Sequence, residues 1–175
     1  ALVSPPPGAF LQATAEGEAA LLQSVALAIG SAKKITDLFA GVGTFALPLA
    51  EHAEVHAVEG ESAMTTALQK GANNAEGLRR VTVETRDLFR RPLEPDEFKG
   101  VDAVVIDPPR AGAEAQMAVL ARSAVPVIAS VSCNPITFAR DAKTLIAGGY
   151  HLDWVQVVDQ FRWSSHVELV ARFSR

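Results

Sequence analysis

The chain of 175 residues contains a single cysteine, Cys133. One thiol excludes an internal disulfide and any metal or iron–sulfur centre built from several cysteines. Runs of about 18 or more uncharged apolar residues are also missing, which excludes a membrane-spanning helix. The first seven residues, ALVSPPP, resemble neither a signal nor a transit peptide and lack a Met, so we expect a processed chain or a fragment. These absences predict a cytoplasmic protein that binds no metal and no membrane.

Positive charge is scarce as well. The chain has 16 Lys and Arg against 20 Asp and Glu, and its net charge is -4. Strong nucleic-acid binders carry an excess of basic side chains that neutralise phosphates. The charge therefore argues against tight binding of nucleic acid by this chain alone. The 49% of hydrophobic residues is ordinary for a globular protein, and the length is enough for one domain with a substantial core.

Apolar runs of strand length alternate with stretches of helical spacing. The expected strands are residues 35–39, 55–59, 81–85, 103–106, 125–131, 152–158 and 167–173, and the expected helices are 16–29, 44–51, 62–75, 113–123 and 135–147. Alternation of this kind predicts an α/β fold with a doubly wound, mostly parallel sheet. The short connection between the last two strands predicts a closing antiparallel hairpin. Seven strands in this arrangement are typical of Rossmann-like methyltransferases, and we expect residues 1–175 to form one domain.

Side chains with useful chemistry lie at or just after the predicted carboxyl ends of these strands. They are Phe39, Glu59, Asp87, Asp107 and Cys133. Ligands of doubly wound sheets bind outside these strand ends. The coincidence therefore predicts a single site formed by several loops.

A glycine turn follows the first predicted strand. In Asp37-x-Phe39-x-Gly41-x-Gly43 the glycines permit a tight turn and a close approach of ligand to backbone. Glu59, at the end of the second strand, is placed to accept hydrogen bonds from ribose hydroxyls. The turn lacks the third glycine of the dinucleotide fingerprint, so the pattern favours S-adenosylmethionine over NAD.

The segment Asp107-Pro108-Pro109-Arg110 ends the fourth strand. Each residue before a proline is restricted to extended geometry, so the segment is stiff and fixes Asp107 at the sheet edge. Many methyltransferases that act on amino groups have an aromatic residue where this chain has Arg110. Cytosine-directed enzymes often place a cysteine in this loop, and here there is none.

Cys133 lies between the fifth strand and the next helix. Asn134 is the expected N-cap, and Pro135 fits the first helical turn. The positive end of that helix predicts a thiol pKa below its usual value of about 8.5. The local sequence leaves two roles open, a catalytic nucleophile and a buried structural thiol.

Together these segments resemble the RNA uracil-5-methyltransferase family, whose enzymes form 5-methyluridine in transfer and ribosomal RNA. The matching segments, in family order, are Phe10-Leu11-Gln12, 37–44, 107–112, 132–135, Asp159-Gln160-Phe161 and His166-Val167-Glu168. Thr14 and Arg162 stand where the family usually has Asn and Pro. The resemblance covers the family's C-terminal catalytic domain, without the upstream RNA-binding portions or the iron–sulfur cysteines of some members.

The resemblance implies a role for individual residues. Cys133 would be the nucleophile and Glu168 the general base in methylation of uracil carbon 5 through a covalent cysteine adduct. The implied S-adenosylmethionine contacts are Gln12, Phe39, Thr44, Glu59, Asp87 and Asp107, beside the turn glycines Gly41 and Gly43. We expect a tRNA or rRNA substrate that this chain binds weakly. Two alternatives stay open: an S-adenosylmethionine-dependent N-methyltransferase with a structural Cys133, and a non-catalytic cofactor-binding module.

Overall fold

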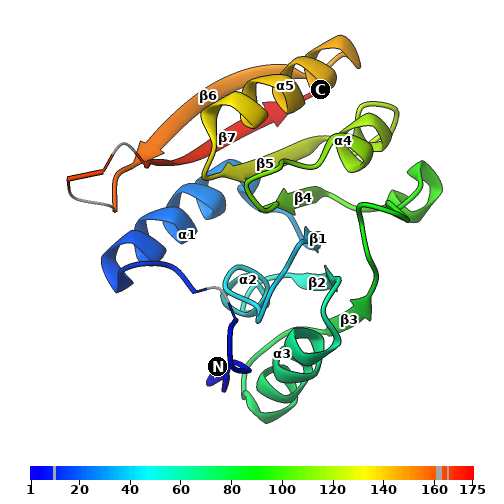
Figure 1. Ribbon diagram of the computed structural model, residues 1–175. Helices are drawn as coiled ribbons and strands as arrows, with labels where there is room; N and C mark the ends of the chain where they lie inside the picture. Colours follow the sequence, from blue (N-terminus) through cyan, green and yellow to red (C-terminus); the bar gives the residue numbers. More distant parts are fainter. Residues whose placement is uncertain (10, 161–162, 165) are drawn as a thin grey trace.

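A computed structural model of the protein shows one seven-stranded sheet with helices on both faces (Figure 1). It describes residues 1–9, 11–160, 163–164 and 166–175. Phe10, Phe161 and Arg162, which the resemblance includes, lie outside the described residues. The strands are β1 (Lys34–Leu38), β2 (Glu54–Glu59), β3 (Val81–Thr85), β4 (Ala103–Ile106), β5 (Val127–Ser132), β6 (His151–Val158) and β7 (Glu168–Ser174). The helices are α1 (Ala15–Ile29), α2 (Ala46–Leu49), α3 (Ser62–Asn74), α4 (Glu114–Leu120) and α5 (Pro135–Ala147), with a 3-10 turn η1 (Pro95–Phe98).

The strand order is β3-β2-β1-β4-β5-β7-β6. Strands β1 to β5 are parallel to their neighbours, and β7 runs antiparallel between β5 and β6. The predicted doubly wound sheet with a closing hairpin is therefore confirmed. The order reverses between β1 and β4, and a reversal of this kind leaves a crevice at the carboxyl ends of the two strands.

Two hydrophobic clusters bury the faces of the sheet. Side chains alternate along β4, so Val105 faces one cluster and Ile106 the other. The first cluster includes Leu21 of α1 and residues of α2 and α3, and the second includes Met117 of α4 and Leu145 of α5. Figure 1 shows these two sets of helices on opposite sides of the sheet. Both faces of the central strands are therefore covered by packed side chains.

Some predicted boundaries are wrong in detail. Helix α2 spans only Ala46–Leu49 instead of 44–51, and it contains Pro48, which has no N–H for a helical hydrogen bond. The 3-10 turn η1 was not predicted, although its sequence signal is present. Glu94 and Glu97 form a reciprocal capping box around Pro95.

The two sides of α1 give a test of the core. Leu21 is completely buried and Leu27 is 72% exposed. We expect Leu21→Ala to lower the free energy of unfolding by about 2–4 kcal/mol, because it leaves a cavity in the first cluster. Leu27→Ala, the control on the same helix, should change it by less than about 0.5 kcal/mol. Urea denaturation measures both, and equal losses would contradict the described packing.

Candidate functional site

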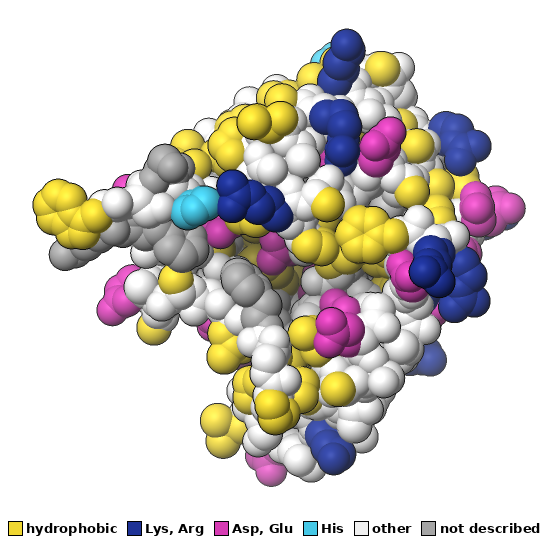
Figure 2. Space-filling model, viewed as in Figure 1, with side chains coloured by type: hydrophobic (Ala, Val, Ile, Leu, Met, Phe, Trp, Pro, Cys, Tyr) yellow, Lys and Arg dark blue, Asp and Glu magenta, His cyan; other side chains and the backbone are white. Residues whose placement is uncertain are grey.

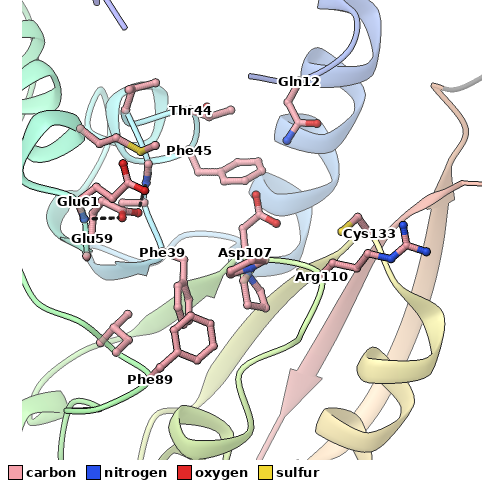
Figure 3. A pocket seen from close by; sticks show the side chains of 18 of the residues that line it. Gln12, Phe39, Thr44, Phe45, Glu59, Glu61, Phe89, Asp107, Arg110 and Cys133 are labelled. Atoms are coloured by element: carbon pink, nitrogen blue, oxygen red, sulfur yellow. Dashed lines mark hydrogen bonds between the residues drawn. The ribbon is translucent and has the colours of Figure 1, made fainter. Parts of the chain in front are cut away.

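A cavity of about 690 Å³ lies at the carboxyl ends of the parallel strands, beside the start of β7 (Figure 3). Nine of the ten site residues expected from the sequence line it: Gln12, Phe39, Gly41, Thr44, Glu59, Asp87, Asp107, Cys133 and Glu168. Gly43 is not among the lining residues and lies against Leu47 and Leu68 instead. The lining also includes residues that the sequence analysis did not propose for the site, notably Phe45, Glu61, Met64, Phe89 and Arg110.

Glu59 ties the glycine turn to the end of β2. Its Oε2 accepts a hydrogen bond of 2.9 Å from the Gly41 N–H, and its Oε1 accepts one of 2.9 Å from the Glu61 N–H (Figure 3). Gly41 has a φ of 57°, and nothing lies within 4 Å of the place where a Cβ would stand. The backbone of the turn is thus open to a ligand. Each carboxylate oxygen of Glu59 has a further lone pair that can accept a hydrogen bond from a hydroxyl group of a ligand.

Two phenylalanines form an apolar wall of the cavity. Phe39 follows β1 with a φ of 60°, a left-handed conformation that is uncommon outside glycine and concentrates at binding sites. Its ring lies 5.3 Å from that of Phe89, at an angle of 55°. Phe89 comes two residues after Asp87, whose Oδ1 accepts the Phe89 N–H at 3.0 Å. The sequence could have indicated Phe89 as a site residue, because this aromatic residue comes only two positions after Asp87, which was already predicted for the site.

Two carboxyl groups at the strand ends are withdrawn from solvent, Asp37 completely and Asp107 partly. Neither oxygen of Asp37, which lies on β1, forms a regular hydrogen bond with a described residue. Burial raises the pKa of Asp37 well above the ordinary value and the charges of Asp107 and Glu59 raise it further, although the Ala46 N–H lowers it. Burial also raises the pKa of Asp107 to about 7, with a contribution from the charge of Glu168. These groups therefore keep a proton at higher pH than exposed carboxyls do.

The register of β5 and β7 brings Cys133 and Glu168 to the same place. Ser132 pairs with Leu169 in this antiparallel ladder, so one step further along lie Cys133 and Glu168. Both line the cavity. Glu168 is 3% exposed, and burial raises its pKa against a hydrogen bond from Gln160, which lowers it. The nearness of the two groups does not depend on any loop.

The prediction of a lowered thiol pKa is wrong. Asn134 does cap α5, as expected, and accepts the Ile136 N–H at 3.0 Å. Burial nevertheless raises the pKa of Cys133, and the charges of Glu168 and Asp107 raise it further. The prediction used only the adjacent helix, whereas the strongest influence is burial, followed by the charges of Glu168 on β7 and Asp107 after β4.

Helix α5 fixes the proline-rich loop that follows β4. The Arg110 carbonyl accepts hydrogen bonds from Asn134 Nδ2 at 3.1 Å and from Thr137 Oγ1 at 3.2 Å. Asp141 accepts the Ala113 N–H at 2.8 Å. Figure 3 shows the Arg110 guanidinium on the same side of the cavity as Cys133, and its charge lowers the pKa of that thiol. The loop thus supplies a cation next to the thiol.

The surface around the cavity carries both signs of charge. Figure 2 shows Lys and Arg side chains scattered among Asp and Glu side chains over the face drawn. Within the described ranges, no group of three or more His, Cys, Asp or Glu side chains is arranged to hold a metal ion. No helix in the same ranges has the length and apolar character needed to cross a membrane.

Comparison with known proteins gives consistent matches. The profile of a family described as tRNA (uracil-5-)-methyltransferase matches residues 5–174. An uncharacterized RNA methyltransferase of Rhizobium meliloti is 56% identical over 99% of this chain and 42% of its own length. A 23S rRNA (uracil(1939)-C(5))-methyltransferase of Chromohalobacter salexigens is 39% identical over 97% of this chain and 35% of its own length. The chain therefore spans about two fifths of the length of such relatives.

Solved structures agree with the fold. The Pyrococcus abyssi tRNA (uracil-54, C5)-methyltransferase, in complex with S-adenosyl-L-homocysteine, matches with a TM-score of 0.79 and 33% identity over 95% of this chain and 40% of that chain. The magnesium protoporphyrin IX methyltransferase of Synechocystis, with a TM-score of 0.69 and 18% identity over 91% of this chain and 80% of that chain, shares the fold alone.

The raised pKa of Asp107 predicts a pH dependence of stability. Its folded value of about 7 exceeds the ordinary 3.8, so folding favours the protonated form. The stability it contributes is complete below about pH 4 and is lost as the pH rises through about 7. We expect Asp107→Asn to reduce the fall in the free energy of unfolding between pH 4 and pH 8, as measured by urea denaturation. Asp96→Asn, at an exposed position, is the control, and equal slopes in the two variants would contradict the raised pKa of Asp107.

Proposed function

This chain belongs to the tRNA (uracil-5-)-methyltransferase family, and we propose that it is the catalytic domain of an enzyme that methylates carbon 5 of uracil in RNA. The methyl donor is S-adenosylmethionine and Cys133 is the nucleophile. The observation that carries the proposal is the position of Cys133 beside Glu168 in one cavity, fixed by the β5–β7 register.

The cavity fits S-adenosylmethionine in its chemistry. Its lining carboxyl groups, Glu59, Glu61, Asp87, Asp107 and Glu168, suit hydroxyl groups, an ammonium group and a sulfonium cation. The same set would repel the pyrophosphate of a dinucleotide. Phe39 and Phe89 supply an apolar wall for a flat ring. When bound, S-adenosylmethionine supplies a methyl group on a positively charged sulfur.

The roles of Cys133 and Glu168 follow from the weak reactivity of uracil carbon 5. Addition of the Cys133 thiolate to carbon 6 moves electron density to carbon 5, which is then methylated. Glu168 takes the proton from carbon 5, the ring double bond re-forms, and the bond between sulfur and carbon 6 breaks. A carboxyl group with a raised pKa is a stronger base than an exposed one, which suits this task. The uracil must leave its stack to reach the cavity.

The raised thiol pKa requires a source of activation. The nearby cation is Arg110, and its charge favours the thiolate. Protonation of Asp107 removes one of the negative charges that oppose thiolate formation. The positive charge of a bound sulfonium would also favour the thiolate form of Cys133. The thiol therefore becomes reactive chiefly in the loaded enzyme.

Methyl transfer to nitrogen is the second candidate, and the raised pKa of Cys133 is the observation that favours it. In that case Cys133 is a structural thiol and no covalent adduct forms.

The two mechanisms are separated by variants of the full-length enzyme. In Glu168→Gln, addition and methylation should proceed while proton removal stops, so a methylated protein–RNA adduct should accumulate. In Cys133→Ala neither adduct nor product should form, with a loss of activity of at least about a thousandfold. Denaturing gels with labelled cofactor measure both. Wild-type turnover by Cys133→Ala would exclude the covalent mechanism and support transfer to nitrogen.

Cofactor binding has its own prediction. We expect Glu59→Ala to weaken the binding of S-adenosylhomocysteine by about tenfold or more, because the turn at Gly41 loses its charged acceptor. Glu76→Ala, at an exposed position that does not line the cavity, should change the Kd by less than about threefold. Titration calorimetry on this chain gives both values. Absence of binding by folded wild-type protein at millimolar ligand would remove the cofactor assignment.

The RNA substrate, a tRNA or an rRNA, should bind this chain weakly. With a net charge of -4 the chain can neutralise few phosphates, so few counterions are released. We expect a shallow dependence of log Kd on log salt, equivalent to fewer than about six phosphate contacts. Filter binding at several salt concentrations tests this, with the full-length protein for comparison. Tight binding by this chain with a steep slope would refute it.

A further inference from the structure

Gln160 connects two parts of the cavity wall that are far apart in the sequence. Its side chain is 9% exposed, and its Nε2 donates a hydrogen bond of 2.8 Å to Oε1 of Gln12. The two residues are 148 positions apart. Gln12 lines the cavity, whereas Gln160 is not among its lining residues. Gln160 thus lies behind the wall and contacts a residue within it.

The hydrogen bond determines which end of the Gln12 amide is available. An amide side chain has one acceptor oxygen and one N–H2 donor group. The oxygen of Gln12 is engaged by Gln160, so the donor group is left for a ligand. Figure 3 shows the Gln12 amide on the side of the cavity that holds Asp107 and Cys133. It is a neutral donor in a cavity lined by five carboxyl groups.

Gln160 also acts on Glu168. A hydrogen bond from its side chain lowers the pKa of Glu168 against the effect of burial. Val158 of β6 pairs with Glu168 of β7, and Gln160 follows Val158 by two residues, so the register of the closing hairpin places Gln160 near Glu168. A single side chain therefore supports Gln12, before α1, and Glu168, at the start of β7.

Helix α1 fixes Gln160 through Gly17. A Cβ at position 17 would lie 2.2 Å from Gln160 Oε1 and 2.8 Å from Gln160 Cβ, so only glycine allows this approach. The Gly17 N–H in turn donates to the Oγ1 of the N-cap residue Thr14 at 2.9 Å. The amide of Gln160 is thereby held against the first turn of the helix.

We propose that Gln160 is a positioning residue that turns the Gln12 donor group toward an acceptor oxygen of the cofactor and holds the Glu168 carboxylate in place. The part that concerns Glu168 rests on the proposed function. The part that concerns Gln12 depends only on cofactor binding.

The test is Gln160→Met, which preserves the length of the side chain and removes both N–H donors. In this chain the Kd of S-adenosylhomocysteine should rise by about threefold to tenfold, measured by calorimetry. In the full-length enzyme the decay of the methylated protein–RNA adduct should require a higher pH, because the Glu168 carboxylate loses a donor and its pKa rises further. The control is Gln156→Met on exposed β6, where Gln156 Nε2 donates to the carbonyl of the next residue, Val157, at 2.9 Å.

Two outcomes would overturn the proposal. One is an unchanged Kd together with an unchanged pH profile in Gln160→Met relative to Gln156→Met. If Gln160→Met does not fold, Gln160→Glu replaces it, since glutamate keeps the shape of the side chain and places a like charge beside Glu168. The second outcome that would overturn the proposal is an unchanged Kd and an unchanged pH profile in Gln160→Glu. Failure of the wild-type enzyme to form 5-methyluridine would instead refute the proposed function. The change in the Kd of S-adenosylhomocysteine would still test whether Gln160 orients Gln12.

Discussion

The antiparallel pairing of β5 with β7 is the constraint on which the site depends. In a purely parallel sheet the residue after β5 would meet only the carboxyl ends of its neighbours. Because β7 runs the other way, its first residue, Glu168, meets the residue that follows β5, Cys133. The ladder that forms the closing hairpin therefore also sets the distance between the proposed nucleophile and base.

Burial of carboxyl groups is the second constraint. The pKa values of Asp37, Asp107 and Glu168 are all raised, chiefly by burial. Such groups lower stability near neutral pH, and proteins retain them mainly where they serve function. A cationic ligand in the cavity would offset part of this effect, so binding of the methyl donor should both stabilise the fold and favour the Cys133 thiolate.

The architecture could be predicted from the sequence because short segments of the chain indicate each strand and helix, and hence their order. Apolar runs such as 103–106 and the glycines after β1 identify a doubly wound sheet without knowledge of contacts. Most of the site followed as well, since parallel strands place Phe39, Glu59 and Asp107 at one edge. Phe89 was missed although its closeness to Asp87 in the sequence was a local signal. The contacts of Gln160 with Gln12 and with Gly17 of α1, in contrast, join distant parts of the chain and have no local signal.

The thiol pKa shows the limit of local reasoning most clearly. The helix N-terminus beside Cys133 is present, as the sequence predicted. Its effect is outweighed by burial and by Glu168 and Asp107, which lie on β7 and after β4. Only the fold places these groups around the thiol.

The most direct measurement is position-resolved nucleoside analysis of tRNA and rRNA from cells with and without the full-length gene. The account predicts that 5-methyluridine disappears from a defined position and returns when the wild-type gene is restored. Unchanged 5-methyluridine together with the loss of an N-methylated nucleoside would contradict it.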